Sequence, residues 1–127
     1  MNSQNLKILI VEDEYIIALD IRTMLEDLGY MVSAIASSGE ESIQKASKMK
    51  PDLVLMDIKL KGGIDGVEAG EEIYRQLRIP IVYLTAFSDK ATLRRINQNK
   101  NGKPSTVIYK PFDEGELRVA INSTLDH

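Results

Sequence analysis

Cysteine is absent from this 127-residue chain, which excludes disulfide bonds, thiolate metal sites and cysteine nucleophiles. Its absence disfavours a disulfide-stapled secreted protein, so we expect a reducing, cytoplasmic environment. The one histidine is the terminal His127, which argues against a histidine general base or phosphocarrier in this chain. No run of about 20 apolar residues occurs, and no signal-peptide pattern follows Met1, so we expect no membrane insertion.

A strong net charge is also missing. Sixteen basic and 19 acidic residues leave a formal net charge of −3, which gives no electrostatic reason to expect nucleic-acid binding. Hydrophobic residues make up 43% and charged residues 28%, the ordinary balance of a globular protein. The length fits one domain, so we expect a single unit over 1–127 with its core between about residues 6 and 125.

Short apolar runs alternate with helical patterns along the chain. The expected strands are 6–11, 30–36, 52–56, 80–84 and 106–109. The expected helices are 15–28, 38–49, 67–77, 89–97 and 113–125. Parallel neighbouring strands need a crossover, and helices in those crossovers cover both faces of the sheet. The alternation therefore predicts a doubly wound α/β domain in three layers.

Local signals add detail to two of these helices. The Asp65-Gly66 pair is typical of turn chemistry and of the cap of the third helix. The first helix carries an apolar stripe, beside which Tyr15 is expected to pack; its members are Ile16, Ile17, Leu19, Ile21, Met24, Leu25 and Leu28.

Polar side chains follow four of the expected strands, where ligands of such sheets bind. They are Glu12, Asp13, Asp57, Thr85 and Lys110. Clustered carboxylates repel one another unless a cation is present, and a hard divalent ion such as Mg²⁺ suits oxygen ligands. Asp57, alone at its strand end, can attack phosphorus to form an acyl phosphate. The metal, the Lys110 ammonium and the Thr85 hydroxyl would then stabilise charge on the transferring group.

The sequence resembles the receiver domain of two-component response regulators from about Leu6 to Leu125. The resemblance is carried by Val-Glu-Asp-Glu at 11–14, Leu-Met-Asp at 55–57 with Asp65-Gly66 after it, Leu-Thr-Ala at 84–86 and Lys-Pro-Phe at 110–112. It implies a flavodoxin-like, five-stranded parallel sheet in the order 2-1-3-4-5 with five helices.

The resemblance also implies a role for each site residue. Asp57 would accept a phosphoryl group from the phosphohistidine of a sensor kinase or phosphotransfer protein. Asp13 and Asp57 would bind Mg²⁺, or Mn²⁺, directly, and Glu12 would bind it directly or through water. The metal would also contact the backbone carbonyl of Lys59. The phosphoryl oxygens would be contacted by Thr85 and Lys110.

Some positions depart from the family pattern. The switch of this family couples the hydroxyl residue, Thr85, to an aromatic residue on the fifth strand, but Val107 occupies that place. Tyr109 lies two residues later, so strand alternation puts it on the same face as Val107, and it is a candidate replacement. Lys61 stands where a proline is usual. Phe87 puts a bulky apolar group near the site entrance, where we expect it to slow hydrolytic water.

Ordinary explanations compete with this interpretation. Glu12 and Asp13 are also typical of the first turn of a helix. Thr85 alone could be a helix cap, and Lys110 alone could be an ordinary surface lysine. Only the placement of all four residues at strand ends favours a functional site. A phosphatase of the haloacid dehalogenase type needs an acid two residues after the nucleophile, where Lys59 stands. Catalysis is therefore expected only for the domain's own phosphotransfer and dephosphorylation. A flavodoxin-like binder or an unphosphorylated interaction module stays a third alternative.

The partners are less defined by the sequence. We expect an unknown downstream protein, bound through the fourth helix, fifth strand and fifth helix, and either a monomer or a phosphorylation-promoted homodimer. Basic residues crowd the fourth helix and the turn after it, as a solvated face or a partner surface: Lys90, Arg94, Arg95, Lys100 and Lys103. No output domain is expected within these residues, so the chain is either a stand-alone regulator or a receiver from a longer protein.

Overall fold

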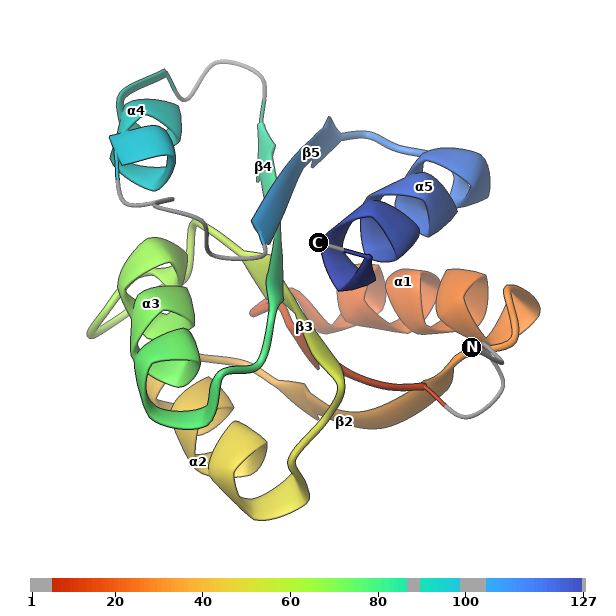
Figure 1. Cartoon of the computed structure of the whole chain (residues 1–127), viewed down its shortest axis with the longest axis horizontal. Coiled ribbons are helices and arrows are strands. Elements are labelled where there is room, and N and C mark those ends of the chain that lie inside the picture. The colour runs from red at the N-terminus through yellow and green to blue at the C-terminus, as the bar shows by residue number, and fades with distance from the viewer. Residues whose placement is uncertain (1–5, 87–89, 99–104, 127) are drawn as a thin grey trace.

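The fold is described by a computed structural model that covers residues 6–86, 90–98 and 105–126 (Figure 1). Predictions for Phe87, Lys100, Lys103, His127 and most of the turn between the fourth helix and fifth strand lie outside these residues. Among the described helices, none is long and apolar enough to cross a membrane.

Strands and helices alternate along the described chain in the predicted order. The strands are β1 (Lys7–Val11), β2 (Met31–Ala36), β3 (Leu53–Asp57), β4 (Ile81–Ala86) and β5 (Ser105–Lys110). The helices are α1 (Tyr15–Asp27), α2 (Gly39–Met49), α3 (Gly66–Leu77), α4 (Lys90–Gln98) and α5 (Glu114–Leu125).

The strands form one parallel sheet in the order β2-β1-β3-β4-β5, which confirms the predicted topology. From β1 the chain goes to β2 at one edge and then returns past β1 to β3, so the strand order reverses between β1 and β3. Such a switch point is where doubly wound sheets bind ligands. Val11 pairs with Met56, and Asp57 pairs with Leu84. The residues that follow β1 therefore lie level with the end of β3.

Alternate residues of each strand enter two apolar clusters, one on each face of the sheet. In β1, Ile8 and Ile10 join the first cluster, Leu9 and Val11 join the second, and all four are fully buried. Helices α1 and α5 complete the first cluster, and α2, α3 and α4 complete the second. Figure 1 shows these two groups of helices on opposite sides of the sheet. Because both faces are covered, the central strands are apolar throughout, which is why they could be predicted.

Capping boxes begin α3 and α5. The Asp65 carboxylate accepts the Glu68 N–H at 2.9 Å, while the Glu68 carboxylate accepts the Asp65 N–H at 3.1 Å. Asp113 and Glu116 repeat the arrangement at α5. Each cap contributes about 1 kcal/mol by satisfying amides that have no partner inside the helix. The predicted capping role of Asp65 is confirmed.

The predicted apolar stripe of α1 is too wide. The buried face consists of Ala18, Ile21 and Leu25, whereas Ile16 is 83% exposed and Tyr15 is 65% exposed. The prediction that Tyr15 packs was therefore wrong. Ile16 lies two residues before Ala18, about 200° around the helix, so it faces away from the sheet. Tyr15 opens the helix immediately after the loop that leaves β1.

Candidate functional site

Three carboxylates meet at the ends of β1 and β3. Glu12 and Asp13 follow β1, Asp57 ends β3, and one carboxylate oxygen from each lies within 4.8 Å of the others. The Glu12 N–H donates to the Ala36 carbonyl oxygen at 2.9 Å, which holds the start of this loop beside β2. Glu12 is only 2% exposed and Asp57 only 6%. Two of the three acids are therefore buried at the switch point of the sheet.

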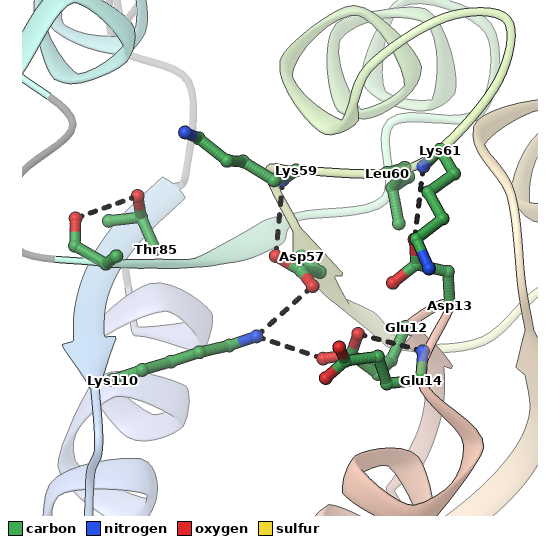
Figure 2. Close-up of a pocket in the computed structure, with 10 residues that line it drawn as sticks. Glu12, Asp13, Glu14, Asp57, Lys59, Leu60, Lys61, Thr85 and Lys110 are labelled. Carbon is green, nitrogen blue, oxygen red and sulfur yellow. Dashed lines mark hydrogen bonds and ion pairs between the residues drawn. The ribbon is translucent and has the colours of Figure 1, made fainter.

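The Lys110 side chain reaches these carboxylates from β5 (Figure 2). Its Nζ lies 3.0 Å from Glu12 Oε1 and 3.1 Å from Asp57 Oδ2. Lys110 ends β5 opposite Ala86 and is followed by a cis peptide bond to Pro111. Because β4 separates β3 from β5, only a long side chain at this position can span the distance to Asp57.

Thr85 lies on β4, the strand between those of Asp57 and Lys110, and is 2% exposed. Its hydroxyl donates to the Ala86 carbonyl oxygen at 3.2 Å. Figure 2 shows Thr85 apart from Asp57, with its hydroxyl on the side away from that carboxylate. The predicted residue thus lines the same site, while its hydroxyl is engaged locally.

Backbone amides orient the three acids. Asp57 Oδ1 accepts the Lys59 N–H at 3.2 Å, and Asp13 Oδ2 accepts the Lys61 N–H at 3.1 Å. Glu12 Oε2 accepts the Glu14 N–H at 3.2 Å. These side chains surround an open cavity of about 350 Å³, lined by Glu12, Asp13, Glu14, Asp57, Lys59, Leu60, Lys61, Thr85, Ala86 and Lys110. All five predicted strand-end residues line this one cavity.

The comparison with known families agrees with this geometry. The family described as "response regulator receiver domain" matches residues 8–122. The chain belongs to this family.

Individual relatives are receivers or contain them. "Transcriptional regulatory protein PdtaR" of Mycobacterium tuberculosis is 37% identical over 115 residues, which are 91% of this chain and 54% of that protein. "Phyllosphere-induced regulator PhyR" of Methylorubrum extorquens is 32% identical over 120 residues, 94% of this chain and 43% of that protein. This receiver thus spans about half the length of the curated relatives that it matches.

Solved structures give the same result for the fold. The signal receiver domain of a modulated diguanylate cyclase from Desulfovibrio desulfuricans G20 superposes with a TM-score of 0.84 at 32% identity, covering 94% of this chain and 93% of that one. The PhyR receiver domain of Erythrobacter litoralis gives 0.79 at 30% identity, covering 95% and 90%. Both neighbours are receiver domains.

The electrostatics of this receiver follow from burial. The pKa of Glu12 is raised to about 7: burial is the largest cause, the neighbouring Asp57 adds to it, and Lys110 acts in the opposite direction. Burial alone would lower the pKa of Lys110, but the carboxylates of Glu12 and Asp57 outweigh it and raise that pKa. Three carboxylates facing one ammonium leave a deficit of positive charge. Their oxygens suit a hard divalent cation, so the residues present fit a metal site.

Replacing Glu12 with Gln is expected to flatten the pH dependence of stability in the metal-free protein. Between pH 4.5 and about 7 the folded wild type holds a Glu12 proton that the unfolded chain has released. The unfolding free energy therefore falls as pH rises through this window, by about 3 kcal/mol in total at about 1.4 kcal/mol per unit. Urea unfolding in EDTA from pH 5 to 8 measures this slope. The exposed neighbour Glu14→Gln serves as control, and an unchanged slope in Glu12→Gln would contradict the assignment.

The switch residues stay predictions. Val107 packs beside the cluster formed with α2, α3 and α4, and Ile108 joins the opposite one, so alternation places Tyr109 on the Val107 face. Tyr109 pairs with Thr85 in the sheet register and is 40% exposed. The role of the Lys59 carbonyl is also a prediction.

Several contacts of the site were not predicted from the sequence. They include the ion pair between Lys110 and Glu12 and the hydrogen bonds from the Lys59 and Lys61 amides to Asp57 and Asp13. In the sequence, Lys61 is notable only because it departs from the family pattern. Every residue type except proline has a backbone N–H, so the residue type does not indicate this hydrogen bond.

Proposed function

We propose that this receiver takes a phosphoryl group on Asp57 in a Mg²⁺-dependent reaction and that the phosphorylated state changes the binding of a partner. One observation carries the proposal. The Asp57 carboxylate, almost fully buried, opens onto a cavity whose lining includes Glu12, Asp13 and Lys110. An isolated surface aspartate or a helix-capping aspartate does not need neighbouring carboxylates and a lysine.

The residues around Asp57 have distinct tasks in this reaction. An Asp57 oxygen forms a new O–P bond while the N–P bond of a donor phosphohistidine breaks, and the electron pair of that bond stays on the imidazole nitrogen. The Lys59 N–H and the Lys110 ammonium hold the two carboxylate oxygens beforehand. Lys110 then remains near the phosphoryl oxygens as their counter-charge, and Thr85 supplies a hydroxyl donor.

The acidic residues would hold the metal. Asp13 and Asp57 are proposed as direct ligands, Glu12 as a ligand directly or through water, and the Lys59 carbonyl as a further oxygen. A bound Mg²⁺, or Mn²⁺ in its place, would neutralise charge on the transferring phosphoryl group. Lys61 orients one oxygen of Asp13 through its N–H, which leaves the other oxygen for the metal.

We propose that the domain catalyses only its own phosphotransfer and dephosphorylation and does not turn over other phosphate esters. Position 59, two residues beyond Asp57, carries a lysine where a haloacid dehalogenase phosphatase needs an acid. The lysine at this position supports a phosphoacceptor role for Asp57 over turnover of other phosphate esters.

The proposed partners are proteins. The donor is a sensor histidine kinase or phosphotransfer protein in the cytoplasm, and the target docks on α4, β5 and α5, alone or through a phosphorylation-promoted homodimer. Lys90 and Arg94 are exposed on α4, whereas Arg95 is tied to Asp65 with Nη1 at 2.8 Å from Oδ2. Part of the basic α4 face is thus an internal link to the start of α3.

Intact mass after incubation with acetyl phosphate and Mg²⁺ tests the phosphoacceptor. Wild type is expected to gain one phosphoryl group, about 80 Da, and Asp57→Asn is expected to gain none, because the amide is a poor nucleophile. Asp20→Asn, an exposed aspartate on α1, is the matched control and should be labelled like wild type. An adduct on Asp57→Asn would place the acceptor elsewhere. A wild type that stays unmodified with both acetyl phosphate and a kinase as donor would indicate a constitutive interaction module.

A further inference from the structure

Three of the backbone amides that anchor the loop between Asp57 and α3 are spaced along its length. The Lys61 N–H donates to Asp13 Oδ2 at 3.1 Å, and the Gly66 N–H returns to the Ile58 carbonyl oxygen at 2.9 Å. Between these points, the Ile64 N–H donates to Glu40 Oε2 at 3.1 Å. The middle anchor is therefore the side chain of Glu40 on α2. Glu40 is not one of the residues that line the site cavity.

Two glycines allow Glu40 and the loop to approach so closely. A Cβ at Gly63 would overlap the Glu40 carboxylate, with its Cδ at 2.7 Å. On the other side, a Cβ at Gly39 would lie 2.7 Å from Ile64 Cγ1 and 2.9 Å from the Ile64 carbonyl oxygen. By contrast, a Cβ at Gly62 would meet nothing within 4 Å. The fit is thus specific to the Gly63 side of the loop.

Apart from these contacts, the segment is held by Ile64, which packs against the apolar cluster that α2, α3 and α4 complete. Gly62 and Gly63 are adjacent, and glycine has more backbone freedom than any other residue. Without the Glu40 hydrogen bond, the chain between Lys61 and Ile64 would lose one of the contacts that fix its path. The Lys61 amide, one residue before the glycine pair, would then be held less firmly against Asp13.

We propose that Glu40 is a positioning residue for the metal site. By binding the Ile64 amide it fixes the loop, and the loop in turn keeps the Lys61 N–H on Asp13 Oδ2, so that Asp13 stays directed at Glu12 and Asp57. Hydrogen bonds to metal-ligating carboxylates tune affinity in this indirect way. The inference rests on the proposed function, because it assigns Glu40 to the same metal site.

A Mg²⁺ titration followed by amide NMR tests the proposal in the whole chain. Glu40→Ala is expected to weaken Mg²⁺ binding about tenfold, the lower end of the effect for outer-shell partners. Glu40→Gln keeps an acceptor oxygen without the charge and is expected to recover most of the affinity. Ser38→Ala is the control, because it removes the N-cap of the same helix without touching the loop, and it should bind Mg²⁺ like wild type.

Hydrogen exchange separates loop positioning from general destabilisation. In Glu40→Ala the Ile64 amide should exchange faster, and the Lys61 amide should follow it although Glu40 does not contact Lys61. The core amides of β3 should keep their relative protection. Faster exchange at Ile64 with an unchanged Lys61 amide would overturn the proposed path from Glu40 to Asp13.

A double-mutant cycle with Gly63 gives an independent test. Gly63→Ala should weaken Mg²⁺ binding in wild type, because the new methyl group displaces the Glu40 carboxylate. In a Glu40→Ala background the same substitution should cost little, since the obstructing carboxylate is gone. Additive losses would overturn the inference.

The failures of the two ideas are distinguishable. If wild type shows no Mg²⁺ response, the proposed function and this inference both fall. If wild type responds and Glu40→Ala binds Mg²⁺ as tightly, the positioning role alone falls.

Discussion

Replacing Gly66 with alanine is expected to lower the unfolding free energy by about 3 kcal/mol and to slow phosphorylation of Asp57 about a hundredfold. A Cβ at this first residue of α3 would overlap the Asp57 carbonyl oxygen and lie 2.7 Å from Ile58 Cα. Those are backbone atoms, which cannot rotate out of the way, so the clash must be relieved by moving α3 or the chain after β3. Overpacking of this kind costs about 1–3 kcal/mol or more. A displacement of about 1 Å at a reacting group can cost about 10²-fold in rate.

Gly115→Ala is the matched control for Gly66→Ala. Gly115 also lies in the first turn of a helix that begins with a capping box, but its Cβ would meet only Asp113 Oδ1, at 3.3 Å. Alanine there should be neutral or stabilise by up to about 1 kcal/mol, since it reduces the freedom of the unfolded chain. Urea unfolding and the rate of labelling by acetyl phosphate measure both effects. A Gly66→Ala protein as stable and reactive as wild type would contradict the close approach of α3 to Asp57.

The fold and the main site residues could be predicted for one physical reason. A parallel sheet buried on both faces requires apolar strands, so the first polar residue after each run marks where the chain leaves the core. Parallel strands all end at the same edge, so Asp57, Thr85 and Lys110 had to lie near one another once the alternation was recognised. The observed register, with Asp57 beside Leu84 and Ala86 beside Lys110, follows that expectation.

Contacts that depend on the route of a loop could not be predicted. The sequence does not show that Glu40 reaches Ile64, because this requires α2 and the loop before α3 to lie side by side. Gly66 was interpreted as part of a turn and cap, while its tight contact with the Asp57 backbone depends on how α3 packs. In α1, a prediction based on apolar residue type placed too many side chains in the core, because Ile16 is apolar yet faces away from the sheet.

Replacing Lys110 with alanine is expected to have two separable effects. The rate of Asp57 phosphorylation should fall about a hundredfold or more, because one preorganised donor to the developing charge is lost. Without metal, stability at pH 8 should fall by about 2 kcal/mol, since the buried Glu12 and Asp57 lose their shared counter-ion. Breaking a fully buried pair costs about 3–5 kcal/mol, and the 29% exposure of the Lys110 side chain reduces this.

The pH dependence of this loss identifies its cause. Without Lys110 the pKa of Glu12 rises further, so at pH 5.5 Glu12 is protonated, the repulsion with Asp57 is relieved and most of the stability should return. Adding Glu12→Gln to Lys110→Ala should have the same effect at pH 8, because it removes one of the two facing charges. Lys45→Ala is the control: its side chain is similarly exposed, at 32%, but its partners are the solvated Glu41 and the neutral Ile35 carbonyl oxygen. No buried charge loses its counter-ion, so a loss of about 1 kcal/mol is expected at both pH values. Urea unfolding in EDTA measures the unfolding free energy of wild type, Lys110→Ala, the double variant and Lys45→Ala. A Lys110→Ala loss that does not change with pH, or that Glu12→Gln does not rescue, would mean that Lys110 stabilises the fold by packing and not as the counter-ion of the site.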